Sequence, residues 1–448
     1  MRRLLDRVGL GRPELRAWAL YDWANSAFVL SVVTVIFPVY FERVLTAGAD
    51  EGVALQRFAW ITSAALLVIA ILSPFLGAIA DFAGIRKRLL AVFLGIGALA
   101  TASLYFVHEG DWLMGALLFA LANVGAQGAF VFYDSLLGHV ANPHEVDRVS
   151  TAGYAVGYFG SALLLTVQLA SMFHPEWFGL PAGAERSPSE TTLPQRLAFV
   201  TTAVWWVAFS IPLFRTVSEP ARRIETDERP GQNPARVALE RLRETFRDLR
   251  SYRHAFLMLV AFLVYNDGIG TIIRMGTIYA SELEIGLVAI TVSLLAAQVV
   301  GIPFAFLFGN LAGRIGPKRA ILIGLGVYVG VTIYAFFLNS AIEFFVLSVV
   351  VATVQGGAQA LSRSLFTSLI PAHRSGEFFG FYGVLDKFAA VTGPAVFGLG
   401  VALTGSVRSG ILPVLLYFLV GGLLLTRVDV EAGRRAARAA EDDLVPAR

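Results

Sequence analysis

Long, uninterrupted apolar stretches are the feature that most restricts how this chain can fold. A helix rises about 1.5 Å per residue, so roughly 20 apolar residues cross the ~30 Å hydrocarbon layer of a membrane. The 448-residue chain is 56% hydrophobic and 15% charged, and it lacks the alternating pattern of a membrane β-barrel. We therefore expect an all-α integral membrane protein with twelve transmembrane helices in contact with the lipid bilayer. The expected spans are residues 16–43, 57–81, 86–107, 111–140, 149–173, 195–215, 254–281, 286–312, 318–338, 342–370, 376–404 and 409–427.

A short charged turn occurs twice, at Gly77–Arg88 and at Gly309–Arg319, about half the chain length apart. Each copy ends one apolar run, turns at a glycine and begins the next run with cations. Similar spacing relates two further pairs of segments, Tyr21-Asp22 with Tyr265–Asp267 and Tyr133–Leu137 with Ser362–Phe366. An internal repeat of this length, with polar residues at matching depths in apolar helices, is typical of membrane transporters.

The repeat predicts two pseudo-symmetric six-helix bundles around a central cavity, which we place at residues 1–215 and 253–448. Residues 216–252 are expected to form a cytoplasmic linker, in which leucines recur at helical spacing after Pro234. That part is either an amphipathic helix on the membrane surface or a solvated basic helix joining the bundles. The polar tail from Val428 is expected to fray.

The distribution of cations sets the expected orientation. Of the 36 Lys and Arg residues, most fall at the ends of spans that would share one side with both termini. Cytoplasmic segments are enriched in Lys and Arg, so both termini are expected to be cytoplasmic. The membrane itself is expected to be a bacterial inner membrane. The sequence pI near 9.1 then reflects topology, and no nucleic-acid partner is expected. The predicted outer loops contain only Arg43, Arg57, Arg186, Arg196 and Arg408.

The chain shows no sequence pattern of an enzyme. There is no HExxH, GxSxG or P-loop sequence, the six histidines are scattered, and there are no cysteines. No catalytic residue, cofactor or metal site is therefore expected. An integral-membrane enzyme is the least favoured class of function.

Ionisable and amide side chains inside the spans are the candidates for substrate contacts. A charge at this depth costs at least about 2.5–3.5 kcal/mol, so it is rarely incidental, although such groups can simply pair and hold helices together. A zwitterion needs an anion for its ammonium and a cation for its carboxylate. Asp22 and Asp267 occupy matched positions for the first role, and Arg274 or Lys387 could serve the second. The residues assigned to substrate binding are Tyr21, Asp22, Asn25, Tyr265, Asn266, Asp267, Arg274, Gln359 and Lys387.

If transport is coupled to protons, Asp22 or Asp267 is the expected proton carrier, because burial disfavours a bare carboxylate. Both side chains lie within predicted spans, beside an asparagine in each half of the chain. Exchange of the carboxylate for an amide at the coupling position is expected to abolish uphill transport and to spare exchange.

A second group of charged residues is assigned to gating. Asp134 and Arg363 are related by the repeat, so they are expected to meet across the bundles, with help from Asp386, when the cytoplasmic side is closed. In the alternative, Arg363 pairs with Asp386 within one bundle. In the repeated turn, Asp81 near a helix C-terminus and cations at the next N-terminus oppose the helix dipoles, which suggests a partner on another helix. The assigned gating residues are Asp81, Arg86, Lys87, Asp134, Arg363 and Asp386.

These spans, halves and charged turns resemble the major facilitator superfamily. Tyr21–Phe28, Tyr265–Gly268, Gly356–Phe366 and Glu377–Tyr382 are similar to the family that includes the fungal autophagy-related vacuolar amino-acid effluxer and bacterial relatives. The resemblance covers about residues 16–427. It implies alternating access, a cavity lined by the first, fourth, seventh and tenth helices, and amino-acid efflux. In the family a small residue commonly precedes the lysine at 387, where this chain has Asp386.

Two alternatives to an amino-acid effluxer stay open at this stage. One is a transporter for another small metabolite or a drug. The other is a transporter-like membrane sensor that binds a small-molecule solute without moving it. Measured flux of the bound solute would separate the sensor from both transporters.

Overall fold

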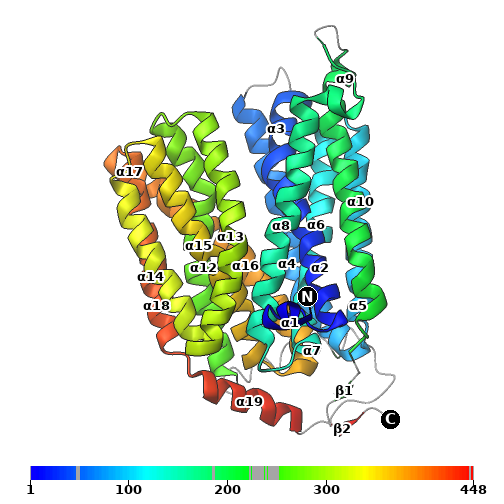
Figure 1. The fold of residues 1–448 in the computed structure, drawn as a ribbon, viewed down its shortest axis with the longest axis vertical. Helices are drawn as coiled ribbons and strands as arrows, with labels where there is room; N and C mark the ends of the chain where they lie inside the picture. Colours follow the sequence, from blue (N-terminus) through cyan, green and yellow to red (C-terminus); the bar gives the residue numbers. More distant parts are fainter. Residues whose placement is uncertain are drawn as a thin grey trace.

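The structure, a computed structural model, describes residues 2–46, 51–183, 187–220, 223–224, 237, 240, 252–442 and 445–446. Nearly all of these residues lie in helices that run roughly parallel to one another (Figure 1). Among the described residues, eleven helical stretches are long and apolar enough to cross a membrane. The remaining predicted span, 376–404, coincides with helix α16, Ser375–Thr404. The all-α membrane fold expected from the sequence is confirmed.

Six spans form the group on the right of Figure 1. Its first span is α2 followed by α3, with a π-helical stretch after each, Phe28–Ile36 and Phe41–Leu45, which the apolar pattern did not predict. Short helices α1 (Arg2–Arg7), α7 (Leu137–Val140) and α9 (Pro188–Thr191) lie outside or at the ends of the spans. The long elements are α2 (Pro13–Ala27) with α3 (Phe37–Tyr40), α4 (Glu51–Ala83), α5 (Arg86–Ser103), α6 (Trp112–Ser135), α8 (Val146–Phe173) and α10 (Leu193–Thr216).

The other six spans form the group on the left of Figure 1. They are α12 (Arg253–Glu282), α13 (Leu287–Ile315), α14 (Pro317–Phe336), α15 (Ala341–Leu369), α16, and a last span divided into α17 (Val407–Ile411) and α18 (Val414–Thr426). A two-residue antiparallel ladder pairs β1 (Arg223–Ile224) with β2 (Val445–Pro446). The predicted linker helix within 216–252 lies almost wholly outside the described residues, so the boundaries of the two bundles stay a prediction.

The expectation of a frayed tail is wrong, because residues Val430–Asp442 form helix α19. The segment is rich in alanine and arginine, which favour helix, and the Oδ1 atom of Asp429 accepts a hydrogen bond from the Ala432 amide at 2.9 Å. At its far end the Oε1 atom of Glu441 accepts from the Ala372 amide at 2.6 Å. The first contact caps the N-terminus of α19, and the second holds its far end against the second group of helices.

Local sequence signals explain several helix ends. Pro13 and Pro317 occupy first helical turns, where a missing amide hydrogen costs nothing. Ser340 and Glu343 form a capping box at the start of α15, with reciprocal side-chain to backbone hydrogen bonds. Gly316, with a φ of 86°, joins α13 to α14 in a conformation that a side chain would strain. These signals place the short turns of the second group at the ends of its apolar runs.

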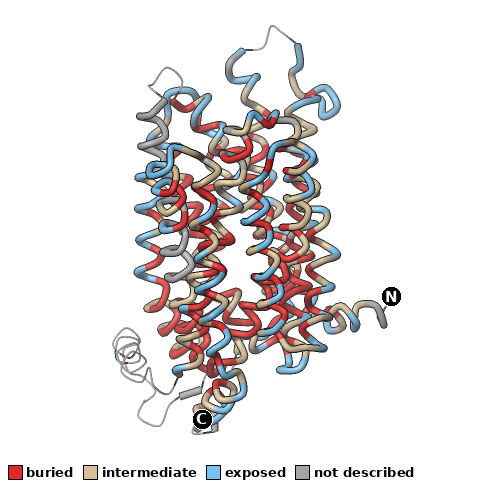
Figure 2. Tube along the Cα trace, turned by 90° about the vertical axis from the view of Figure 1, so that its left-hand side faces the viewer, coloured by how far each residue is buried: buried red, intermediate tan, exposed pale blue. Residues whose placement is uncertain are grey.

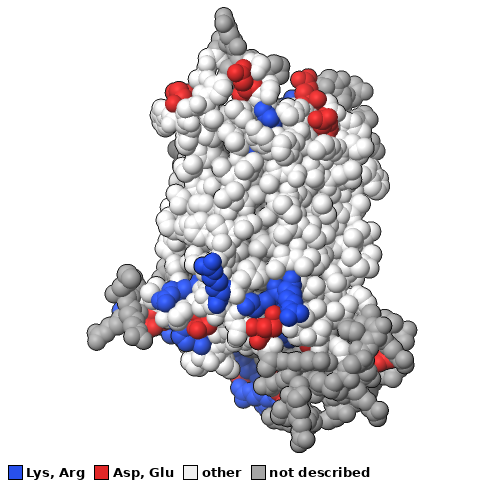
Figure 3. Space-filling model, turned by 90° about the vertical axis from the view of Figure 1, so that its right-hand side faces the viewer, with Lys and Arg blue, Asp and Glu red and all other residues white. Residues whose placement is uncertain are grey.

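Burial and charge divide the molecule into an uncharged middle region and two ends that carry charged residues. Large apolar side chains on the outer faces of the helices are exposed, among them Ile71, Leu99 and Leu423, as expected of surfaces that face lipid. Figure 2 shows buried residues most densely in the half that carries the chain termini. The face in Figure 3 has a broad uncharged middle, and its Lys and Arg gather at that same end, which we call the basic end.

The two groups of helices meet along two seams, α4 with α16 and α8 with α13. In the first seam the backbones touch. A Cβ atom added to Gly77 would lie 2.1 Å from the carbonyl oxygen of Gly376, and one added to Gly380 would lie 2.6 Å from that of Ser73. Glycine at both positions is therefore required for this close approach.

Candidate functional site

A cavity of about 430 Å³ lies between the two groups of helices and is lined by residues from both. Its volume is in the range typical of small-molecule sites. The lining comes from all four helices expected from the resemblance (α2, α6, α12 and α15) and from α4, α8, α13 and α16. The polar residues among the lining are Asp22, Ser26, Thr34, Ser73, Gln127, Asp134, Tyr154, Tyr158, Ser161, Asn266, Gln298, Gln355, Gln359, Arg363 and Tyr382.

Three charged side chains form the floor of this cavity. On α2, α6 and α15 respectively, Asp22, Asp134 and Arg363 are the lining residues closest to the basic end. Arg363 and Asp22 are 3% and 4% exposed. The charges thus lie deep in the molecule, at the point where the cavity ends and the packed basic end begins.

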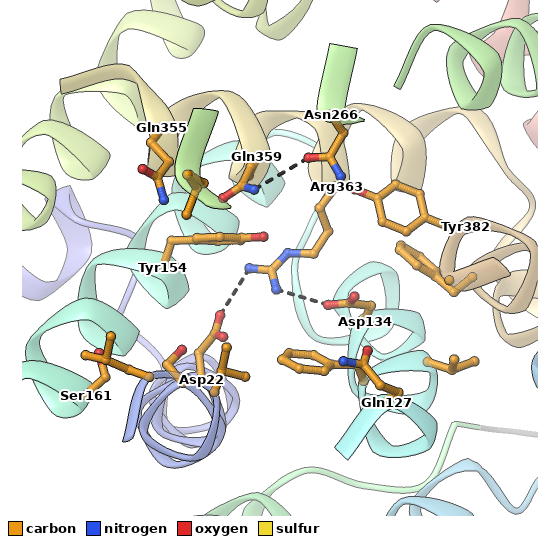
Figure 4. A pocket seen from close by; sticks show the side chains of 18 of the residues that line it. Asp22, Gln127, Asp134, Tyr154, Ser161, Asn266, Gln355, Gln359, Arg363 and Tyr382 are labelled. Atoms are coloured by element: carbon orange, nitrogen blue, oxygen red, sulfur yellow. Dashed lines mark hydrogen bonds and ion pairs between the residues drawn. The ribbon is translucent and has the colours of Figure 1, made fainter. Parts of the chain in front are cut away.

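Arg363 links the two groups of helices through these carboxylates (Figure 4). One terminal nitrogen donates to Oδ1 of Asp134 at 3.0 Å, and the other donates to Oδ2 of Asp22 at 3.3 Å. The Nε atom donates to the Ser150 hydroxyl at 2.9 Å, and a terminal nitrogen donates to the Ser150 carbonyl at 3.1 Å. The predicted contact between Asp134 and Arg363 is therefore present, whereas the contact with Asp22 was not expected.

Aromatic rings surround the same guanidinium. Its central carbon lies 4.7 Å from the ring centroid of Trp18, 4.8 Å from that of Tyr154 and 5.6 Å from that of Tyr133. Tyr133 also donates its hydroxyl hydrogen to Oδ2 of Asp22 at 3.1 Å. The faces of aromatic rings attract cations, most strongly where water is excluded. The floor is thus an enclosed binding site for a cation, which Arg363 itself occupies.

Amide side chains dominate the polar lining above the floor. Gln359 donates from Nε2 to Oδ1 of Asn266 at 3.5 Å, and Gln127, Gln298 and Gln355 also line the cavity. An amide offers both donors and acceptors without net charge. This part of the cavity can therefore hold polar neutral or charged groups of a solute by hydrogen bonds alone.

The residues predicted to bind substrate divide into three sets. Asp22, Asn266 and Gln359 line the cavity. Four others are described but are not among its lining residues: Tyr21, Asn25, Tyr265 and Asp267. The side chains of Arg274 and Lys387, and that of the predicted gating residue Asp386, lie outside the described residues.

The second set packs within the two groups of helices. The Tyr21 ring lies 4.7 Å from that of Tyr133, and the Tyr265 hydroxyl is 2.5 Å from that of Ser362. Asp267, 2% exposed, accepts a hydrogen bond from the Thr392 hydroxyl of α16. The structure therefore does not bring Asp22 and Asp267 to one surface of the cavity, although their sequence positions match.

Beneath the floor, the basic end is closed by the first copy of the charged turn. The two carboxylate oxygens of Asp81 accept from the backbone amides of Gly376 and Glu377 at 3.0 and 2.9 Å. An anion at the first turn of α16 is favoured by the helix dipole. The partner on another helix that the sequence called for is thus the N-terminus of α16, and the gating role of the contact stays a prediction.

Arg86 completes this contact between the two groups of helices. Its Nε atom donates to Oδ1 of Asp81 at 2.6 Å, and a terminal nitrogen donates to the carbonyl oxygens of Ala372 and His373 at 3.1 and 3.0 Å. Arg86 is 4% exposed. The turn therefore binds the peptide groups at the start of α16 with both a carboxylate and a guanidinium.

Lys87, also predicted to gate, has a different position. Its ammonium donates to the carbonyl oxygens of Phe214, at 3.1 Å, and Val217, at the end of α10 in its own group. Lys318, the corresponding lysine of the second copy, donates to the carbonyls of Thr426 and Val428 at 2.8 and 2.7 Å. The repeated lysines thus occupy equivalent positions, each at the C-terminus of the last span of its group, where a cation is favoured.

The sequence analysis did not assign Ser150, Trp18 or Tyr154 to the site, and no charge pattern marks them. A signal did exist for part of the amide lining. Gln355, Gln359 and Arg363 are spaced by four residues, so they lie on one face of a helix. That spacing extends the site from Arg363 to Gln355. Among the described residues, no group of three or more His, Asp or Glu side chains could hold a metal ion.

Comparisons with known proteins agree with this architecture. The sequence profile of the family described as vacuole effluxer Atg22-like matches residues 11–438. An uncharacterized MFS-type transporter, YxiO of Bacillus subtilis, is 35% identical over 430 residues, which cover 95% of this chain and 97% of the relative. Autophagy-related protein 22-1 of Phaeosphaeria nodorum is 24% identical over 539 residues, covering 98% and 94%.

Solved structures show the same fold at low sequence identity. The proton:xylose symporter XylE has a TM-score of 0.67 and 14% identity, over 95% of this chain and 96% of that chain. An outward-facing bacterial homologue of the iron transporter ferroportin has a TM-score of 0.66 and 14% identity, over 93% and 99%. The expected major facilitator fold is confirmed, and the relatives are transporters and not enzymes.

Proposed function

The chain belongs to the family of vacuole effluxer Atg22-like proteins, and we propose that it exports amino acids by alternating access. It is a multi-pass membrane transporter of the major facilitator type. Amino acids as the solute, export as the direction, and cytoplasmic termini in a bacterial inner membrane are parts of the proposal. One observation carries it: a cavity between the two groups of helices ends at charged residues that link those groups.

Alternating access requires that contacts at one end of the cavity break while those at the other end form. In this conformation the contacts at the basic end are made. Two of them are the link from Arg363 to Asp22 and Asp134, and the link from Asp81 to the start of α16. We assign both to the gate that closes the cytoplasmic side. Opening to the cytoplasm would then require both to break, so their combined strength sets the balance between the two states.

Substrate contacts follow from the polarity of the lining. Asp22 is the proposed site for the ammonium of the amino acid, and Asn266 and Gln359 are proposed to bind the rest of its polar groups. Arg274 or Lys387 remains the proposed partner of the carboxylate. Tyr21, Asn25, Tyr265 and Asp267 do not line the cavity in this conformation, so we assign them to shaping the walls or to the opposite conformation.

Proton coupling through Asp22 or Asp267 is a separate part of the proposal. Asp22 borders the cavity and also contacts Arg363, so its charge can respond to the state of the gate. Asp22→Asn should abolish accumulation against a gradient and spare exchange of solute for solute in proteoliposomes. If neither Asp22→Asn nor Asp267→Asn alters accumulation driven by a pH gradient, neither residue couples protons.

The function itself is tested by flux and binding measured on the same purified protein. In proteoliposomes loaded with labelled amino acids, we expect exchange that saturates and is faster than in protein-free vesicles. A ligand at 100 times its Kd stabilises the native state by about 2.7 kcal/mol, so a thermal-shift screen with amino acids, sugars and drugs identifies candidates first. Binding without flux would support the sensor, and flux of only sugars or drugs would reject amino acids.

A further inference from the structure

We propose that Arg363 is a built-in substitute for the transported solute, and that this solute is an organic amine with a net positive charge. The inference rests on the proposed transport function. Arg363 and the cationic group of the solute would then be alternative partners of Asp22 and Asp134. The corresponding solute class is basic amino acids and diamines.

The charge balance at the floor is the first observation. Two carboxylates, Asp22 and Asp134, contact a single guanidinium, with nitrogen–oxygen distances of 3.3 and 3.0 Å. Charges in a poorly solvated site must be compensated. Of these three side chains two are acidic and one is basic, so together they attract a positively charged solute in the cavity above more than a negatively charged one.

The shape of the site is the second observation. Trp18 and Tyr154 place their rings 4.7 and 4.8 Å from the guanidinium carbon, and Tyr133 both approaches that carbon and hydrogen-bonds Asp22. All three rings and both carboxylates come from the first group of helices, whereas Arg363 comes from the second. When the groups separate at the basic end, the first group keeps a complete cation site without its cation.

Because the cation site and Arg363 belong to different groups of helices, the solute and Arg363 can occupy the site in turn. With the basic end open, Arg363 moves away with α15, and a cationic group from that side takes its place between Asp22 and Asp134. When the basic end closes, Arg363 returns and competes with the solute, which is displaced into the cavity above. The amide lining there, with Gln359 and Gln355 one and two turns above Arg363, holds the departing solute by uncharged hydrogen bonds. Arg363 thus both closes the basic end and displaces the solute from its site.

The binding test uses ligands that differ in charge and little in shape. L-arginine and L-citrulline form one such pair, and L-lysine and L-norleucine form another. For the purified full-length protein, we expect the charged member of each pair to bind at least about tenfold more tightly in a thermal-shift titration, a clearly resolved difference. Equal or tighter binding of citrulline and norleucine would overturn the inference.

Two variants test the competition. Arg363→Gln removes the internal cation and leaves both carboxylates, so arginine should bind more tightly than to the native protein. A misfolded variant cannot give that gain. Asp22→Asn should bring the affinities for arginine and citrulline close together. Asp111→Asn, at the opposite end of the molecule where its carboxylate accepts from the His108 amide, is the matched control and should leave the preference unchanged.

The outcomes separate this inference from the proposed function. If Arg363→Gln weakens arginine binding, Arg363 contacts the solute directly and the competition is wrong, although transport of amino acids stands. If neutral amino acids exchange in proteoliposomes and basic ones do not, the solute class is wrong and the effluxer stands. Absence of flux for every amino acid and diamine overturns both.

Discussion

At the scale of single residues, the most consequential side chain is Arg363, which links the two groups of helices. Its side chain carries five N–H donors, and the contacts to Asp22, Asp134 and Ser150 engage both terminal nitrogens and Nε. All of these partners belong to the opposite group of helices. Loss of one member of such a buried ion pair leaves an uncompensated charge, which commonly costs about 3–5 kcal/mol.

The first prediction is a charge exchange between Asp134 and Arg363. We expect Asp134→Arg and Arg363→Asp each to lower transport by roughly tenfold or more, because each leaves like charges in contact at the floor. The double variant restores the pair and should recover part of the activity. Recovery is partial because an arginine at 134 lies in the same group of helices as Asp22 and can pair with it there.

Transport in proteoliposomes and state-dependent labelling are measured for all four proteins. The prediction fails if the double variant is as inactive as the singles and labelling shows the same distribution of states in each. Trp18→Phe offers a milder control, since it keeps a ring against the guanidinium and leaves both carboxylates.

The second prediction concerns Asp81. Asp81→Asn keeps the shape of the side chain and removes the charge that faces the first turn of α16 and Arg86. Hydrogen bonds to a charged group contribute about 1.5–3 kcal/mol, so the closed basic end should be populated less. The native chain has no cysteine, which allows a single reporter, Ala360→Cys, at a position that is 0% exposed.

Alkylation of that cysteine should be several-fold faster in Asp81→Asn than in the otherwise native reporter protein. Asp111→Asn at the far end should leave the rate unchanged. Equal rates in all three proteins would show that the contact between Asp81 and α16 does not hold the basic end closed.

At the scale of elements, the lengths of the apolar stretches and the positions of the charged turns were enough to predict most of the helices. Every expected span corresponds to a helix, and the capping of α15 and the turn at Gly316 follow from local residues. The docking of α19 could not be predicted, because it depends on Glu441 reaching the Ala372 amide, a contact between residues far apart in sequence. The π-helical stretch at Phe28–Ile36 has no recognisable signal in its apolar residues.

The sequence predicted how far along its helix each site residue lies, and it did not predict which way the side chain points. The repeat placed Asp134 opposite Arg363 because it fixes how far along its helix each residue lies. It does not fix the rotation of a helix about its axis, which tertiary packing decides. Asp22 therefore turned toward Arg363, and Asp267 turned toward Thr392, although they occupy equivalent positions in the two halves.

The prediction at this scale concerns the repeated lysines. Lys87→Met and Lys318→Met keep an apolar stem and remove the ammonium that binds carbonyl groups at the ends of α10 and α18. Each change should destabilise the protein by about 1 kcal/mol, the usual size of a cation at a helix C-terminus. The thermal transition of purified protein measures this, and Lys→Arg at the same positions should retain most of the stability. Full stability in Lys→Met would contradict the assignment.

At the scale of the whole molecule, charge is distributed by end. The face in Figure 3 has its basic residues mainly at the end where α1 and α19 lie, whereas acidic residues occur at both ends. A membrane protein with this asymmetry is expected to orient its basic end to the cytoplasm. The same end carries both links of the proposed gate.

Orientation is tested with two single-cysteine variants of the cysteine-free chain. Ala182→Cys lies in the turn opposite the basic end, and Ala439→Cys lies in α19; both positions are exposed. A membrane-impermeant maleimide applied to intact cells should label the first and not the second, and permeabilisation should make both reactive. The reverse pattern would invert the topology and with it the proposed direction of export.

The close contact between the backbones of α4 and α16 has a consequence for the turnover rate of transport. Where Gly77 meets Gly376 and Gly380 meets Ser73, backbone lies directly against backbone. Parting such a surface requires no rotamer to change, so the mechanical resistance to separation is small. We expect the time needed to break the polar links at the basic end, more than this stretch of the seam, to limit the turnover rate.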